Sequence, residues 1–432
     1  MERKPFFLRL TLAGLVVRIL FLLLEPSARL VGDEHTWTAW GAEIASPAVA
    51  FSPAATRLIF YPPLYPYFIA ASLWLFGALS AVKWCQVFVA ALLVPAVGRV
   101  GAAALGQRAG TLAAAIAAFY PDLVWFSVHF WSETLFLALL WWAFERLIVA
   151  DSEGDRAAAL LAGLLYGLAI LTRETALYFA PLAAAWLVLN RTRPGARARG
   201  AAFLLAAAFS VLPWSARNLV VYGAFVPVST AGGLNLWQGN ASLSREEVYA
   251  LYAQVPGRIE KYRYARRMGL AAIAARQPGW ILEKLWDEMP RFWEPDSLAL
   301  AHLRREAYGP VSVLGYRLAW VAAVVPYLLV LALFVLGVTR APLGRSQALL
   351  LGFAAYYALL HVATHGFARY RLPLMPLLFI YAGFACEAWR GSVTRPLAPR
   401  RAMLGALLGL VLGASVVRGL TQPEEAEEAP PQ

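Results

Sequence analysis

The sequence predicts an all-α integral membrane protein with about 11 transmembrane helices. Of its 432 residues, 60% are hydrophobic and only 15% are charged, whereas an ordinary soluble domain carries about 25% charged residues. Apolar runs recur along nearly the whole chain and are separated by short segments that contain arginine. A water-soluble fold could not hide so much apolar surface, but a lipid bilayer accommodates it.

Eleven apolar runs are the expected spans. Their ranges are 6–25, 83–105, 109–127, 130–149, 157–172, 175–189, 200–217, 311–338, 346–364, 371–389 and 402–419. Several are shorter than the roughly 20 residues that a straight span needs, so the expected number ranges from about 10 to 13. The first run is similar to a signal peptide, but no small-x-small cleavage site follows it, and we expect a retained first helix.

One further apolar run, 62–79, decides the topology. If it does not span, the N-terminus and the arginine-rich short loops near 146–156, 191–199 and 390–401 fall on the cytoplasmic side, as the positive-inside rule requires. If it spans, those loops face outward. We therefore place 62–79, with its prolines and aromatic residues, as a juxtamembrane helix on the outer face.

This topology divides the chain into four parts. They are an N-terminal transmembrane module 1–217 with the first outer loop 26–82, an outer segment 218–310 between helices 7 and 8, C-terminal transmembrane helices 311–420, and a disordered acidic tail 421–432. Within the outer segment we expect helices near 243–276 and 278–289. We also expect a tight turn at Gly232 and Gly233.

The predicted topology also explains where the basic residues behind the net charge of +12 lie. The basic residues lie in short loops and not in a patch with interleaved aromatic residues, so we predict no nucleic-acid partner. Cys85 and Cys386 lie far apart without metal-ligand spacing. The sequence has no Walker-type phosphate loop, and its inner loops are too short for a nucleotide-binding domain. An enzyme of this plan would take its activated donor from the membrane.

Two adjacent carboxylates follow the first predicted span. Asp33 and Glu34 lie at the outer membrane edge, where a carboxylate can act as a general base on a hydroxyl or amine. Adjacent residues of a helix do not face each other, so we expect only one of the pair to reach a given reacting atom. The alternative is an ordinary solvated loop carboxylate.

His129 and Glu133 occupy a second outer turn, between two predicted spans. Ionisable groups at the membrane edge are functional candidates. The alternative is a simple helix start, with Ser132 as the cap and Glu133 in the first turn.

Several basic residues are predicted to lie on the outer side, against the positive-inside rule. Arg173 is one of them, and either an anionic phosphate or an ion pair with Glu174 would explain it. The segment 361–371 adds His361, His365, Arg369 and Arg371, and Arg217 precedes the outer segment; these suit a phosphate pocket, with lipid headgroup contact as the alternative. The two histidines share a helix face, but no third metal ligand is in view.

These motifs together resemble the lipid-dependent GT-C glycosyltransferases. The similarity is greatest to bacterial homologues of the protein O-mannosyltransferases and to the transferases that attach aminoarabinose or galacturonate to lipopolysaccharide. The residues that carry it are Asp33 and Glu34, the aromatic pattern from Trp37 to Ile44, the run Tyr61-Pro62-Pro63-Leu64-Tyr65, Glu133, Pro213-Trp214 with Arg217-Asn218, the runs 225–230 and 232–240, and Arg369-Tyr370-Arg371-Leu372-Pro373.

The resemblance implies transfer of a sugar from a polyprenyl-phosphate-linked donor to a glycan, lipid or protein acceptor outside a bacterial inner membrane, typically with inversion. By analogy, Asp33 is the general base, and Glu34 and Glu133 orient the acceptor or the base. The groups expected to hold the donor phosphate are Arg173, Arg217, Arg369, Arg371, Tyr61 and His365. No cofactor is predicted with certainty, and a divalent metal is left open.

Two other classes of function compete with this one. A transporter or flippase of lipid-linked sugars would show internal repeats and charge near the midplane, whereas here the charges gather at the outer edge. The second is a non-catalytic scaffold. Within the enzyme class, an oligosaccharide ligase is the alternative to a monosaccharide transferase.

Overall fold

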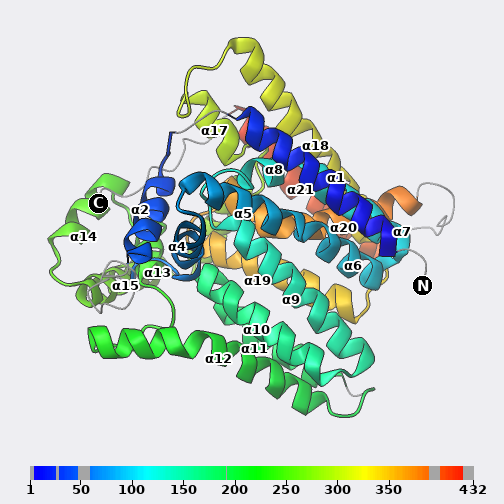
Figure 1. Ribbon diagram of the computed structural model, residues 1–432, viewed down its shortest axis with the longest axis horizontal. Coiled ribbons are helices and arrows are strands. Elements are labelled where there is room, and N and C mark those ends of the chain that lie inside the picture. Colours follow the sequence, from blue (N-terminus) through cyan, green and yellow to red (C-terminus); the bar gives the residue numbers. More distant parts are fainter. Residues whose placement is uncertain (1–3, 26–28, 47–58, 191, 389–398, 422–432) are drawn as a thin grey trace.

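A computed structural model of the chain is entirely helical over the residues that it describes, which are 4–25, 29–46, 59–190, 192–388 and 399–421 (Figure 1). The predicted disordered tail lies outside these residues, apart from Thr421. Helices cover each of the 11 predicted spans. They are α1 (Lys4–Leu24), α5 (Leu79–Ala91), α6 (Leu93–Leu105), α7 (Gln107–Phe119), α8 (Pro121–Phe126), α9 (Glu133–Glu153), α10 (Arg156–Thr172), η2 (Glu174–Phe179), α11 (Ala180–Val188), α12 (Ala196–Tyr222), α18 (Val313–Arg340), α19 (Arg345–Ala363), η3 (Ala368–Leu374), α20 (Met375–Glu387) and α21 (Pro399–Thr421).

Six helices within the described residues are long and apolar enough to cross a membrane. They are Phe6–Leu24, Leu79–Leu105, Ala196–Tyr222, Val313–Arg340, Arg345–Ala363 and Pro399–Thr421. These confirm the prediction of an all-α integral membrane protein, while the total of 11 spans stays a prediction. The predicted run 109–127 is interrupted, because Pro121 disfavours a helical conformation at Tyr120, whose ψ is 122°.

The predicted juxtamembrane run 62–79 forms α4 (Leu64–Phe76), which has 13 residues. Such a helix is about 20 Å long, shorter than the roughly 30 Å of a hydrocarbon core. It ends at Gly77, whose φ of 74° suits glycine, and its last residues Trp74, Leu75 and Phe76 are exposed. Its length and its exposed apolar end agree with a helix that lies at the interface.

The bundle is packed through small residues. Gly163 and Gly167 of α10 lie against α12, and a Cβ added to Gly163 would be 2.3 Å from the carbonyl oxygen of Phe203. A Cβ added to Gly167 would be 2.6 Å from the Cβ atom of Ser210. Glycines one turn apart let two helix backbones approach closely, which is how apolar helices associate in lipid.

The described loops gather at the two ends of the bundle, while their sides of the membrane stay a prediction. At one end, Arg345 pairs with Asp151 at 2.9 Å, and Asn190 donates to the same carboxylate at 2.8 Å, so the loops that follow α9, α11 and α18 meet there. The other end carries α2 (Asp33–Ala45), α4, α13 (Ala231–Gln238), α14 (Arg245–Gln254) and α15 (Arg258–Ala275), all on the left in Figure 1.

The outer segment continues with α16 (Trp280–Phe292) and α17 (Leu298–Arg304), and α14, α15 and α16 confirm the helices predicted near 243–276 and 278–289. The expected turn at Gly232 and Gly233 is wrong. Both residues lie in the first turn of α13, where a Cβ on Gly233 would be 2.9 Å from Tyr262 of α15. The two glycines serve close helix packing.

A buried lysine fastens the outer segment to the C-terminal helices. Lys284 of α16 donates to the carbonyl oxygens of Gly239 at 2.7 Å and Thr364 at 3.0 Å, and to the carboxylate of Glu288 at 3.0 Å. Glu288 in turn accepts from the backbone N–H of Gly366 at 2.8 Å. These bonds fix the loop that leads from α19 to η3, and hence the position of Arg369.

Candidate active site

Side chains from distant parts of the chain converge on one cavity of about 110 Å³. It lies where the N-termini of α2 and α9, the C-terminus of α10, the start of α13 and η3 come together. Its charged lining residues are Asp33, Glu133, Arg173, Glu174 and Arg369. Four of these five were predicted as site residues from sequence.

Asp33 is the first residue of α2, after Gly32, whose φ of 57° turns the chain into the helix. Its carboxylate is 15% exposed and lies 3.8 Å from the guanidinium of Arg369. A carboxylate in the first turn of a helix is stabilised by the helix dipole. The side chain is thus held at the cavity by electrostatic attraction and remains accessible.

Glu34 is buried on another side of α2 and does not line this cavity. Its carboxylate accepts hydrogen bonds from the backbone N–H groups of Phe130 at 2.8 Å and Val31 at 2.9 Å, and from the hydroxyl of Tyr308 at 3.0 Å. Burial alone would raise the pKa of Glu34. The hydrogen bond and charge of His129 and the two backbone N–H groups outweigh burial and lower that pKa. Glu34 therefore anchors the helix start that carries Asp33.

The groups behind Glu34 form a buried aromatic cluster. The ring of His129 stacks on Trp125 at 4.2 Å, and Tyr308 lies between Glu34 and His302. Burial lowers the pKa of His302 to about 4, and burial together with the Glu34 charge raises the pKa of the Tyr308 hydroxyl. These ring contacts and hydrogen bonds around a single carboxylate make a rigid support for α2.

Glu133 begins α9 and is 2% exposed, so the helix start that the sequence suggested is also a cavity wall. Its Oε1 accepts a hydrogen bond of 2.7 Å from Arg173. Its Oε2 is buried and accepts no hydrogen bond from the described residues. The predicted alternative, an ion pair of Arg173 with Glu174, is not what the structure shows: the carboxylate at Arg173 belongs to Glu133.

Aromatic rings surround the two cationic groups. The Arg369 guanidinium lies 5.3 Å from the Trp131 ring and 5.0 Å from the Tyr370 ring, and Arg173 lies 5.8 Å from the ring of Tyr370. Tyr61 lines the opposite wall, packed on Trp37 at 4.9 Å. Aromatic faces hold guanidinium groups in place without neutralising them.

Two predicted phosphate ligands lie elsewhere. Arg371 is buried and donates to the carbonyl oxygens of Glu294 at 2.6 Å and Asp296 at 2.7 Å, so it joins η3 to the chain before α17. Arg217 stacks on Trp214 at 4.8 Å and on Tyr222 at 5.4 Å along α12. The structure brings neither to the cavity with Arg173 and Arg369.

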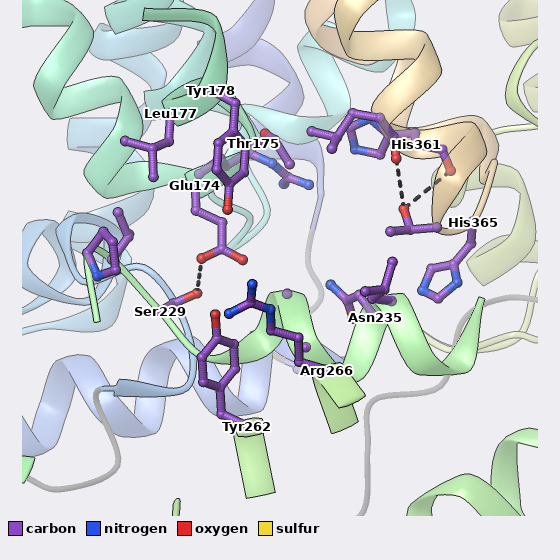
Figure 2. A pocket seen from close by; sticks show the side chains of 18 of the residues that line it. Glu174, Thr175, Leu177, Tyr178, Ser229, Asn235, Tyr262, Arg266, His361 and His365 are labelled. Atoms are coloured by element: carbon purple, nitrogen blue, oxygen red, sulfur yellow. Dashed lines mark hydrogen bonds between the residues drawn. The ribbon is translucent and has the colours of Figure 1, made fainter. Parts of the chain in front are cut away.

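A second cavity, of about 300 Å³, adjoins the first (Figure 2). Both are lined by Arg173, Glu174, Ser229, Asn235 and Tyr370. The second also receives His361 and His365, so the predicted phosphate ligand His365 lies beside the first cavity and not in it. The ring of His361 is engaged with the carbonyl oxygen of Tyr357 at 2.8 Å.

Sequence reasoning passed over Glu174, Ser229 and Asn235 as site residues. Glu174 was weighed only as a partner for Arg173, and Ser229 and Asn235 only as parts of longer motifs. Glu174 accepts a hydrogen bond of 2.6 Å from Ser229, 55 positions along the chain. Its position next to an arginine on the outer side was the signal that could have singled it out.

The comparisons with known proteins agree with this fold. Residues 61–216 match the family model described as dolichyl-phosphate-mannose-protein mannosyltransferase. No curated protein matches the sequence. All of the chain aligns with 57% of the archaeal oligosaccharyltransferase AglB from Archaeoglobus fulgidus, in complex with an inhibitory peptide and a dolichol-phosphate, with 15% identity and a TM-score of 0.52.

A bacterial structure is similar to the same degree. ArnT from Cupriavidus metallidurans, bound to undecaprenyl phosphate, aligns over 93% of this chain and 63% of its own, with 14% identity and a TM-score of 0.51. The chain thus has the fold of the GT-C glycosyltransferases, as its motifs predicted. It spans less than two thirds of the length of either of these proteins.

A metal ion is another way to place positive charge at such a site. The Archaeoglobus fulgidus oligosaccharyltransferase has also been crystallised with Zn and sulfate; that structure is 14% identical, with a TM-score of 0.51, over 99% of this chain and 54% of its own. Among the residues that our structure describes, no group of three or more His, Cys, Asp and Glu side chains could hold a metal. The three cavity carboxylates, of Asp33, Glu133 and Glu174, therefore do not form such a group.

Proposed function

We propose that this protein is a membrane glycosyltransferase that moves a sugar from a polyprenyl-phosphate-linked donor to an acceptor on the outer face of a bacterial inner membrane. The observation that carries the proposal is the meeting of Asp33, Glu133, Arg173 and Arg369 in one cavity. The fold supports the class of reaction, and the lipid phosphates bound to AglB and ArnT support the class of donor.

The reaction is a single displacement at the anomeric carbon. Asp33 takes the proton of the acceptor hydroxyl while the acceptor oxygen forms a bond to the anomeric carbon. The bond between that carbon and the phosphate oxygen breaks, and polyprenyl phosphate leaves with one more negative charge. Arg173 and Arg369 stabilise this charge as it develops, because both guanidinium groups are already oriented by their neighbours.

Glu133 has a supporting role in this scheme. Its Oε1 orients Arg173, which lines the same cavity. Tyr61 and its aromatic neighbours form a wall that excludes water. Single-displacement chemistry inverts the configuration of the anomeric carbon, so the product should have the opposite configuration to the donor.

The decisive experiment analyses envelope glycolipids and glycoproteins by mass spectrometry in a strain that lacks the gene. Complementation with the wild type should restore a glycosylated product, and Asp33→Asn should not, since loss of a general base slows transfer by at least ~100-fold. The control is Asp287→Asn, the same change at an exposed residue of the outer segment, which should restore the product. Full restoration by an Asp33→Asn protein expressed at the wild-type level would remove Asp33 from the chemistry.

The transporter hypothesis requires a separate assay. Vesicles that contain the pure protein and a fluorescent polyprenyl-phosphate sugar, but no acceptor, should show no transbilayer movement of the sugar above that of protein-free vesicles. Movement that survives in Asp33→Asn would instead support a flippase.

A further inference from the structure

The larger cavity is a built polar chamber that the scheme above leaves unused. Glu174 stands on the wall that it shares with the smaller cavity. Figure 2 shows Ser229, Tyr262 and Arg266 directed toward Glu174 from below, with Asn235 and His365 on the right of the view. Most ligand sites combine such a few convergent polar groups with apolar walls, here Leu177, Leu236 and Leu360.

Glu174 is held firmly in this position. Its carboxylate accepts from the Ser229 hydroxyl at 2.6 Å and from the backbone N–H of Gly232. A Cβ on Gly232 would lie 2.8 Å from Oε1 of Glu174, so the α13 backbone approaches the carboxylate more closely than any other residue would allow. Burial raises the pKa of Glu174 to about 7. An ionisable group that is held away from water at a cavity wall is a candidate for ligand recognition.

The proposed position of the donor phosphate indicates which part of the donor lies in this chamber. In the proposed donor, the sugar is bonded directly to the phosphate. With the phosphate on Arg173 and Arg369 as proposed, a sugar ring bonded to it can enter the larger cavity, because Arg173 lines both cavities. A volume of about 300 Å³ is at the lower limit of small-molecule sites, which suits one sugar ring and not an oligosaccharide.

We propose that this chamber binds the sugar ring of the donor and that Glu174 selects a sugar with a hydroxyl or ammonium group in place of a carboxylate. The inference rests on the proposed function and adds the class of sugar. A carboxylate accepts hydrogen bonds from hydroxyl and ammonium groups. A uronic acid would place a second carboxyl group against Glu174, and two carboxyl groups that share a site away from water cannot both ionise without repulsion.

The test compares three polyprenyl-phosphate donors, which carry a neutral hexose, an aminopentose and a hexuronic acid. The wild type should use either of the first two and disfavour the third. Glu174→Ala should raise the KM for the preferred donor by roughly 10- to 100-fold, the effect of losing hydrogen bonds to a charged group, with a smaller change in kcat. Glu174→Gln should have a KM for the preferred donor between those of the wild type and Glu174→Ala. It should also show a smaller difference in kcat/KM between the preferred donor and the hexuronic acid donor than the wild type does.

Glu283→Ala is the matched control, because it removes a carboxylate that is 52% exposed on α16. A preference of the wild type for the hexuronic acid, or unchanged KM and donor preference in Glu174→Ala, would overturn the inference. So would a raised KM for the acceptor alone, since the chamber would then hold the acceptor.

Failure of the two proposals can be told apart. If the wild type transfers none of the three sugars, the proposed function fails. If the wild type transfers a sugar and Asp33→Asn does not, while Glu174→Ala behaves like the wild type, only the chamber assignment fails. Should Glu174→Ala not fold, Ser229→Ala and Asn235→Ala test the same chamber, and protection of each variant against thermal unfolding by each donor measures binding without turnover.

Discussion

The two adjacent carboxylates at the start of α2 have different proposed roles: Asp33 takes part in the reaction, and Glu34 stabilises the helix start. Substitution of each residue tests this assignment. In Glu34→Gln, the amide oxygen can still accept from the N–H of Phe130, and the amide nitrogen can donate to the Tyr308 oxygen, because a hydroxyl accepts as well as donates. The N–H of Val31 then faces a donor and loses its hydrogen bond, and all three bonds lose their charged partner. We expect Glu34→Gln to destabilise the protein by about 3 kcal/mol, the upper end of the effect of losing one hydrogen bond to a charged group.

The assay is thermal unfolding in detergent, together with transfer activity, for Glu34→Gln, Asp33→Asn and the Asp287→Asn control. Glu34→Gln should unfold at a clearly lower temperature and keep partial activity. Asp33→Asn should unfold close to the wild type and be inactive. Because the pKa of Glu34 is lowered, its stabilising effect is present above the ordinary pKa of 4.5 and is lost as the pH falls below it. Wild-type stability with complete inactivity in Glu34→Gln would show that Glu34 reacts directly.

The remaining predictions concern the cationic and buried groups. Arg369→Lys should lower kcat by at least ~100-fold, as the loss of a preorganised donor to the leaving oxygen does, whereas Arg108→Lys, 72% exposed at the other end, should not change kcat. The raised pKa of Glu174 gives a pH dependence: its folded form favours protonation, so its contribution to stability is complete below pH 4.5 and is lost as the pH rises through about 7. Glu174→Gln should therefore be more stable than the wild type at pH 8 and equal to it at pH 4.5, as measured by thermal unfolding; an equal difference at both pH values would contradict this.

The fold class and the chemical character of the site could be predicted from the sequence, because both depend on patterns that survive without a structure. Apolar runs predict helices in lipid, and basic residues on the outer side mark a functional region. Asp33, Glu133, Arg173 and Arg369 all emerged this way, and all line the same cavity. Their common feature is a charge at the end of a helix.

Side-chain direction could not be predicted. Arg369 and Arg371 belong to one motif, but they lie in a 3-10 helix, where residues two apart point in different directions. Only Arg369 faces the cavity. Arg217 was expected at a helix end, whereas α12 continues to Tyr222 and gives the guanidinium aromatic partners along its own surface. Such details depend on where a helix ends, which is the least certain part of a sequence-based assignment.

In the proposed reaction, the Asp33–Arg369 pair connects donor binding to the activation of the base. At 3.8 Å, with side chains 15% and 11% exposed, this contact is worth at most about 1 kcal/mol. A lipid phosphate that reaches Arg369 competes with Asp33 for the guanidinium, and Asp33 can then accept the proton of the acceptor. Donor binding should therefore precede productive binding of the acceptor.

This coupling makes a prediction that separates Asp33 from a simple binding role. Asp33→Asn removes the competing carboxylate, so it should bind polyprenyl phosphate as tightly as the wild type or up to about fivefold more tightly, although it transfers no sugar. Arg369→Lys should bind the lipid more weakly, since lysine cannot make the bidentate contact with a phosphate. Equilibrium titration of polyprenyl phosphate into the purified variants in nanodiscs measures both. If Asp33→Asn instead bound the lipid at least fivefold more weakly, Asp33 would be part of the phosphate site, for example through a bound cation, and its assignment as the general base would be wrong.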